Sequence, residues 1–144
     1  MAEYSKTAVI NAPAAAVWEV IRDFNGTGKF SPVVADSVWE TENHGPGGLR
    51  TITMKDGSKA LDRLDVLDDE NMVITYSILE AEPPFPFKGY QATMRLKPLG
   101  ESSCELTWSC FFLPRGDSEA PALEIISNVY SAGIEGLQKL LARG

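Results

Sequence analysis

The spacing of apolar residues changes along the chain, and each change marks an expected element. Residues 7–10 read as a strand, and Pro13 begins a helix whose apolar positions recur at helical spacing. Residues 25–28 are expected to end that helix, and a short turn or helix follows at residues 30–32. Residues 33–113 alternate as in an antiparallel meander of about six strands. Five turn-like segments separate these strands: 43–48, 55–57, 68–71, 82–87 and 99–102.

A longer helix is expected near the C-terminus. Asp117 and Ser118 can cap it, and Pro121 fits its first turn. Its apolar stripe consists of Leu123, Ile126, Tyr130, Ile134, Leu137 and Leu141. Such a stripe must be buried, and the concave face of a curved sheet is the largest surface available. We therefore expect one α+β domain over residues 1–144, in which a curved antiparallel sheet of about seven strands wraps around the C-terminal helix, with two short helices after the first strand.

The hairpin around Asp56 and Gly57 determines which residues face each other. A two-residue turn would set Arg50 opposite Arg63, where like charges repel. A three-residue loop that ends with Gly57 in the left-handed conformation pairs Arg50 with Asp62 instead, with Cβ atoms about 5 Å apart. Because opposite charges then meet, we expect the second register.

Alternation along the strands predicts an apolar inner face that carries a small polar cluster. The expected inner positions are Arg50, Ile52, Met54, Ala60, Asp62, Leu64, Val66, Met72, Ile74, Tyr76, Ile78, Tyr90, Ala92, Met94 and Leu96. A five-residue loop after the second strand of the hairpin would place Tyr76 beside Asp62. Arg50, Asp62, Tyr76 and Tyr90 are the candidate catalytic residues. In the alternative interpretation, Arg50 and Asp62 form an ion pair at the rim worth at most about 1 kcal/mol, and the tyrosines only pack.

The same faces supply the expected ligand-binding residues. These are Ile52, Leu64, Ile74, Ile78, Ala92, Met94, Phe85, Phe87, Ile126, Tyr130, Gly133 and Ile134. Gly133 lowers helix stability relative to alanine, so we expect it to leave room for a bound molecule. The proline-rich segment 82–87 is interpreted as a stiff, apolar entrance loop. Alternation on the last strand favours Cys104, Leu106, Trp108, Cys110 and Phe112 as inward-facing residues.

Composition narrows the possible partners. Thirteen Lys and Arg against 20 Asp and Glu give a net charge of −7, which disfavours nucleic acid and anionic lipid. We expect a cytoplasmic protein, a monomer or weak homodimer, without signal peptide or transmembrane segment. Cys104 and Cys110 lie too far apart along one strand to form a disulfide. The sole histidine, His44, lies in a glycine-rich turn and is expected to be exposed, so we expect no metal site and no cofactor.

Several motifs resemble those of the START-like helix-grip superfamily, which includes birch-pollen-allergen relatives and the polyketide cyclase/dehydrase group. Residues 62–70 are similar to a stretch of plant abscisic acid receptors. Residues 17–18, 23–24, 48–50, 71–72, 90–94 and 108–109 resemble lachrymatory factor synthases. The resemblance implies that Arg50 and Asp62 match a cavity arginine and glutamate that carry a proton transfer, and that Tyr76 and Tyr90 match two active-site tyrosines.

The chain departs from both relatives. Asp62 is shorter than the glutamate by one C–C bond of about 1.5 Å. The receptors' proline-containing gate loop is replaced by residues 54–58, and no lysine occurs between Ser31 and Leu49, so abscisic acid is a poor candidate ligand. Matching to the receptors would also turn Thr107 and Ser109 inward, against the alternation described above.

Three functions follow as hypotheses. In the first, the protein binds a small hydrophobic ligand in a cavity, and Arg50 and Asp62 carry out cofactor-free isomerisation, dehydration or cyclisation of it. The second is a carrier or ligand sensor without turnover. The third is an interaction module that uses the entrance loop. The fold alone cannot separate them, because it carries all these roles.

Overall fold

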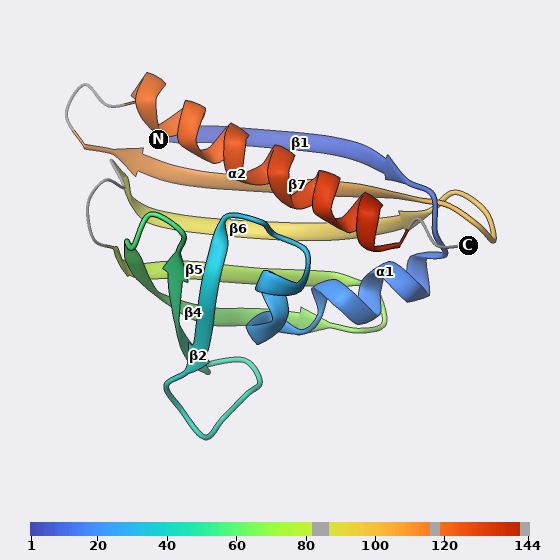
Figure 1. Cartoon of the computed structure of the whole chain (residues 1–144), viewed down its shortest axis with the longest axis horizontal. Helices are drawn as coiled ribbons and strands as arrows, with labels where there is room; N and C mark the ends of the chain where they lie inside the picture. The colour runs from blue at the N-terminus through green and yellow to red at the C-terminus, as the bar shows by residue number, and fades with distance from the viewer. Residues whose placement is uncertain (82–86, 116–118, 142–144) are drawn as a thin grey trace.

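The computed structural model describes residues 1–81, 87–115 and 119–141 (Figure 1). The elements are β1 (Ala2–Ile10), α1 (Ala14–Ile21), the 3₁₀ helix η1 (Phe24–Lys29), β2 (Val34–Trp39), β3 (Leu49–Met54), β4 (Lys59–Asp68), β5 (Val73–Ala81), β6 (Phe87–Pro98), β7 (Cys104–Pro114) and α2 (Glu119–Leu140). The strands form one seven-stranded antiparallel sheet in the order β1-β7-β6-β5-β4-β3-β2, and α2 lies along it (Figure 1). The predicted α+β architecture is confirmed.

The short helix η1 begins earlier than the sequence predicts. It covers residues 24–29, which include the segment expected to end the first helix. The backbone N–H of Gly26 donates to the Asp23 carbonyl at 2.9 Å, and that of Phe30 donates to the Thr27 carbonyl at 3.2 Å. Because a 3₁₀ helix needs only these short-range bonds, a segment without apolar periodicity can form it.

The β3–β4 hairpin has the predicted register. Arg50 lies opposite Asp62, and Gly57 has a φ of +91°, the left-handed conformation that glycine adopts without strain. The backbone N–H of Gly57 donates to the Met54 carbonyl at 2.9 Å and closes the turn. Charge repulsion between Arg50 and Arg63 and the left-handed turn at Gly57 thus favour the same pairing, that of Arg50 with Asp62.

The β4–β5 pairing differs from the prediction. Tyr76 lies opposite Leu64, and Asp62 lies opposite Ile78, so the expected pairing of Tyr76 with Asp62 is wrong. A register shift between Leu64 and Val66 inserts one extra residue in β4. This bulge reverses the alternation, so that Val66 is 44% exposed rather than inward-facing.

Strand β7 follows simple alternation. Its inward residues are at most 6% exposed: Cys104, Leu106, Trp108, Cys110 and Phe112. Thr107 instead shares a hydrogen bond of 3.3 Å with Thr7 at an exposed position. The receptor-like orientation with Thr107 and Ser109 inward is therefore wrong. Both cysteines are free and buried, as expected.

Two glycines let α2 approach its neighbours closely. A Cβ on Gly133 would lie 2.8 Å from Cζ3 of Trp108, and one on Gly136 would overlap the Phe30 carbonyl oxygen. The space at Gly133 is therefore filled by the Trp108 indole, and the expectation that it accommodates a bound molecule is wrong. Asp117 and Ser118, expected to cap α2, lie outside the described residues.

We predict that Gly136→Ala lowers the free energy of unfolding by about 3 kcal/mol, because the new methyl group meets backbone that cannot rotate away. Gly28→Ala is the matched control. Its Cβ would meet nothing closer than 3.7 Å, so we expect a change within about 0.5 kcal/mol. Urea denaturation measures both, and equal effects would contradict the close approach of α2.

Candidate functional site

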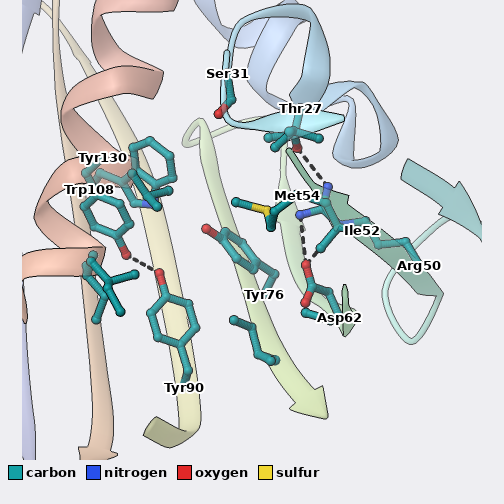
Figure 2. A pocket seen from close by; sticks show the side chains of 16 residues that line it. Thr27, Ser31, Arg50, Ile52, Met54, Asp62, Tyr76, Tyr90, Trp108 and Tyr130 are labelled. Atoms are coloured by element: carbon teal, nitrogen blue, oxygen red, sulfur yellow. Dashed lines mark hydrogen bonds and ion pairs between the residues drawn. The ribbon is translucent and has the colours of Figure 1, made fainter. Parts of the chain in front are cut away.

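A cavity of about 80 Å³ lies between the inner face of the sheet, η1 and α2 (Figure 2). All four candidate catalytic residues line it, each from a different strand: Arg50, Asp62, Tyr76 and Tyr90. At roughly 10–15 Å³ for each water-sized group, the cavity holds about five to eight such groups. Drug-sized pockets measure about 300–1,000 Å³, so the guest that fits this conformation is small.

The apolar residues of the prediction divide into two groups. Those that line the cavity are Ile52, Ile78, Ile126 and Tyr130. Those outside its lining are Leu64, Ile74, Ala92, Met94, Gly133 and Ile134, which belong to the packed core. Ile74 and Met94 line a smaller cavity on the other side of Arg50 and Tyr76. Phe85 and the side chain of Phe87 lie outside the described part of the chain. The cavity thus occupies only one part of the inner face.

Several lining residues were not among the predicted site residues. They are Thr27, Ser31, Val34, Met54, Ala60, Trp108, Ile125 and Val129. Met54, Ala60 and Trp108 were expected to face inward, and this could have identified them. Ile125 and Val129 adjoin the predicted stripe of α2. Nothing in the hydrophobic pattern brings Thr27 or Ser31 to the site, because their position depends on η1.

Arg50 and Asp62 form a buried ion pair. Their side chains are 4% and 3% exposed, so the alternative of an ion pair at the solvated rim is wrong. The Arg50 Nε and Nη2 groups donate to the same Asp62 oxygen, Oδ2, at 3.1 and 3.0 Å. Nη1 donates to Thr27 Oγ1 at 2.8 Å and to the Phe24 carbonyl. The guanidinium also lies 3.8 Å from the centre of the Phe24 ring.

These contacts use four of the five N–H donors of Arg50. Arg50 therefore joins η1 to the sheet and orients the Asp62 carboxylate. A ligand that bound the guanidinium in full would have to break these bonds. The geometry therefore favours a positioning role for Arg50.

The second oxygen of Asp62, Oδ1, is buried and has no hydrogen-bond partner among residues 1–81, 87–115 and 119–141. Burial raises the pKa of Asp62, because a desolvated carboxylate is unfavourable, while Arg50 opposes the shift. A buried polar atom without a partner is uncommon in proteins. Oδ1 is thus the Asp62 oxygen left to accept or donate a proton.

The aromatic residues of the cavity remain neutral donors or acceptors. The hydroxyls of Tyr90 and Tyr130 share a hydrogen bond of 2.5 Å, and burial raises the pKa of both. Desolvation raises the pKa of Tyr76 to about 12. Trp108 stacks on Tyr130 with ring centres 4.0 Å apart. None of these groups ionises near neutral pH, so Asp62 is the titrating group of this cluster.

The described residues contain no group of three or more metal-ligating side chains. His44 is exposed, as predicted, and stacks on Trp39 with ring centres 4.4 Å apart. Within the same residues, no helix combines the length and apolar character needed to cross a bilayer.

The chain belongs to the polyketide cyclase / dehydrase and lipid transport family, whose model matches residues 1–142. It is 28% identical over 123 residues to the abscisic acid receptor PYL10 of Oryza sativa subsp. japonica, covering 76% of this chain and 57% of the receptor. The chain thus spans little more than half the length of that relative.

Two solved structures match nearly the whole chain. The protein XoxI of Bacillus cereus has a TM-score of 0.90 and 28% identity, and the match covers 99% of this chain and 97% of that one. An uncharacterised protein of Bacillus thuringiensis has a TM-score of 0.88 and 28% identity, with coverage of 98% and 99%. The resemblance to the helix-grip superfamily and its cyclase/dehydrase group is confirmed. Family and fold also agree with small-molecule binding.

We predict that the Asp62 carboxyl titrates above the ordinary aspartate pKa of about 3.9, because burial disfavours its charge. Asp56 serves as an internal control, because hydrogen bonds from Ser58 lower its pKa. Side-chain ¹³C NMR across a pH titration measures both groups. An Asp62 midpoint at or below that of Asp56 would contradict the burial described here.

The raised pKa of Asp62 also makes the stability of the protein depend on pH. Between the unfolded and the raised folded pKa, the folded protein retains a proton that the unfolded chain has released. The contribution of Asp62 to stability is therefore fully present below the unfolded pKa and is lost as the pH rises through the folded pKa.

Proposed function

We propose that the protein binds a small, mostly apolar carbonyl compound in the cavity and that Asp62 transfers a proton on it without a cofactor. The observation that carries this proposal is the Oδ1 atom of Asp62, which is buried and has no hydrogen-bond partner in the part of the chain that the structure describes. Asp62 itself is 2% exposed and lines the cavity. The family's description, polyketide cyclase / dehydrase and lipid transport, supports both the ligand class and the reaction class.

The proton transfer can be written with its atoms balanced. The Asp62 carboxylate takes a proton from the carbon next to the carbonyl group, and the electron pair of that C–H bond moves toward the carbonyl oxygen to give an enolate. Return of the proton at another position completes an isomerisation. A raised pKa brings the carboxylate closer to the value that suits a general base.

Arg50 supports this step without reacting. It holds Oδ2 through two hydrogen bonds, so Oδ1 is the oxygen left for the ligand. Its bonds to Thr27 and Phe24 fix the guanidinium, and the carboxylate is thereby oriented before the ligand binds.

A carrier or sensor without turnover is the second candidate. The observation that favours it is the mostly apolar lining, in which aliphatic side chains from β2, β3, β5 and α2 surround the polar cluster. In that function Asp62 would anchor a polar group of the cargo. Similarity to an abscisic acid receptor is compatible with this role.

Deuterium exchange separates the two functions. Incubation of 3-hydroxybutan-2-one, a four-carbon hydroxy ketone, with the protein in D₂O is expected to exchange its α-hydrogens, as followed by ¹H NMR. We predict that Asp62→Asn lowers the rate at least about 100-fold, because it removes the general base. Asp65→Asn is the matched control, because Asp65 lies on the same strand but does not line the cavity. It accepts hydrogen bonds from Arg63, Ser77 and Gln91.

The result is interpreted with the fold of each variant checked by circular dichroism. Exchange that is lost in Asp62→Asn and retained in Asp65→Asn supports catalysis. Binding of the ketone without exchange above the buffer rate would contradict turnover and support the carrier. An equal rate in Asp62→Asn and the wild type would remove Asp62 from the mechanism.

A further inference from the structure

A second buried polar atom belongs to another residue that lines the same cavity. Within the described residues, the side-chain atoms that are buried without a hydrogen bond are Asp62 Oδ1 and Trp108 Nε1. Trp108 is 3% exposed and lies on β7, whereas Asp62 lies on β4. Leaving either atom unpaired disfavours folding, so a ligand that satisfies both would recover this cost on binding.

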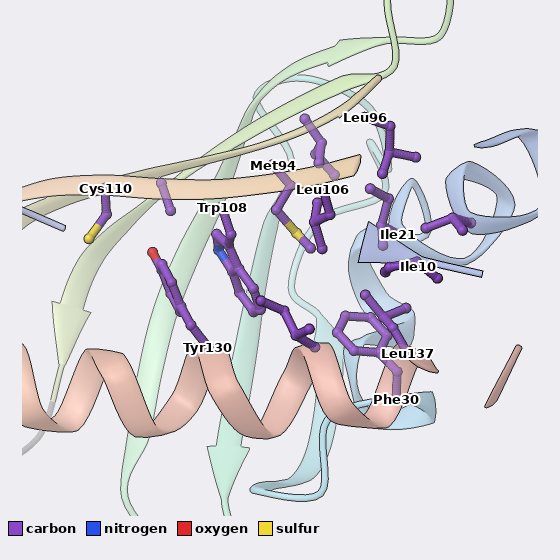
Figure 3. Close-up of a cluster of buried hydrophobic side chains, with 14 of the residues drawn as sticks. Ile10, Ile21, Phe30, Met94, Leu96, Leu106, Trp108, Cys110, Tyr130 and Leu137 are labelled. Atoms are coloured by element: carbon purple, nitrogen blue, oxygen red, sulfur yellow. The ribbon is translucent and has the colours of Figure 1, made fainter. Parts of the chain in front are cut away.

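The indole of Trp108 is held in one orientation. One face stacks on the Tyr130 ring with an interplanar angle of 11°, and its Cζ3 edge packs against the backbone of α2 at Gly133 (Figure 3). It cannot rotate without displacing α2 or Tyr130. An indole N–H donates and never accepts, so the group that meets Nε1 must be an acceptor.

Tyr76 provides a second donor beside Trp108. Figure 2 shows the Tyr76 ring between Asp62 and Trp108, with its hydroxyl directed toward Trp108 and Tyr130. The hydroxyl stays protonated at neutral pH, because its pKa is about 12. The hydroxyls of Tyr90 and Tyr130 share a hydrogen bond, whereas the Tyr76 hydroxyl lies beside the Trp108 side chain and is placed to serve a ligand there.

We propose that Trp108 Nε1 and the Tyr76 hydroxyl bind the carbonyl oxygen of the ligand, while a hydroxyl or acidic C–H group of the same molecule faces Asp62 Oδ1. This assignment rests on the proposed function and specifies its ligand as a neutral hydroxy-carbonyl compound. Two donors on the carbonyl oxygen would also stabilise the negative charge that develops there as Asp62 removes a proton.

The same arrangement disfavours carboxylates. The buried Asp62 repels a second negative charge, and four of the five donors of Arg50 are already engaged. A hydroxy ketone should therefore bind better than the hydroxy acid of similar size.

The indole N–H signals in ¹H–¹⁵N NMR test the assignment directly. Titration with 3-hydroxybutan-2-one is expected to shift the Trp108 signal downfield. The Trp18 signal is the internal control, because its N–H already donates to Asp69 at 2.8 Å. Butan-2-one, which keeps the carbonyl and lacks the hydroxyl, should shift Trp108 with weaker binding. Lactate should leave it unchanged.

A variant adds a second readout. Trp108→Phe keeps an aromatic ring and removes the donor, so the Kd for 3-hydroxybutan-2-one should rise about tenfold. If this variant fails to fold, the wild-type titration decides the assignment. A Trp108 signal that stays fixed while the ketone binds overturns it, as does an unchanged Kd in a folded Trp108→Phe protein.

The two proposals fail in different ways. If exchange depends on Asp62 and the Trp108 signal does not move, the carbonyl assignment is wrong and the proposed function stands. If the Trp108 signal moves and no exchange occurs, the carbonyl assignment stands and catalysis is wrong. If neither ketone binds, both are overturned.

Discussion

The buried pair of Arg50 and Asp62 is the interaction on which the site depends. It joins β3 to β4 and, through Thr27 and Phe24, attaches η1 to the sheet. Burying two charges costs solvation free energy that their attraction offsets only when hydrogen bonds satisfy both groups. Here most N–H donors of Arg50 are bonded, whereas one oxygen of Asp62 has no partner among the residues that the structure describes. This asymmetry leaves Asp62 Oδ1 as the atom on which the proposed function depends.

The fold around the pair follows from patterns that sequence alone reveals. Alternation predicts the inward residues of β6 and β7, and the left-handed Gly57 combined with charge pairing predicts the partner of Arg50. These features are local, because they depend on strand period and on one turn. All four polar candidates accordingly line the cavity.

Features that depend on the three-dimensional context were not predictable in the same way. The bulge between Leu64 and Val66 adds one residue to β4 and turns Val66 outward. It was not predictable, because one extra residue leaves the hydrophobic pattern almost unaltered. From the sequence, Gly133 predicts free space beside α2, whereas in the structure the Trp108 indole fills that space. Thr27 reaches the site only because η1 folds over Arg50. The cavity is therefore smaller, and more closely bounded by aromatic rings, than an apolar basin inferred from alternation.

An atomic-resolution crystal structure of the protein grown with 3-hydroxybutan-2-one tests the central claim most directly. The account predicts a ligand oxygen within hydrogen-bond distance of Asp62 Oδ1, with Oδ2 still held by Arg50. An Asp62 side chain turned to bulk solvent, or an Oδ1 atom bonded to a donor from the protein itself, would contradict it.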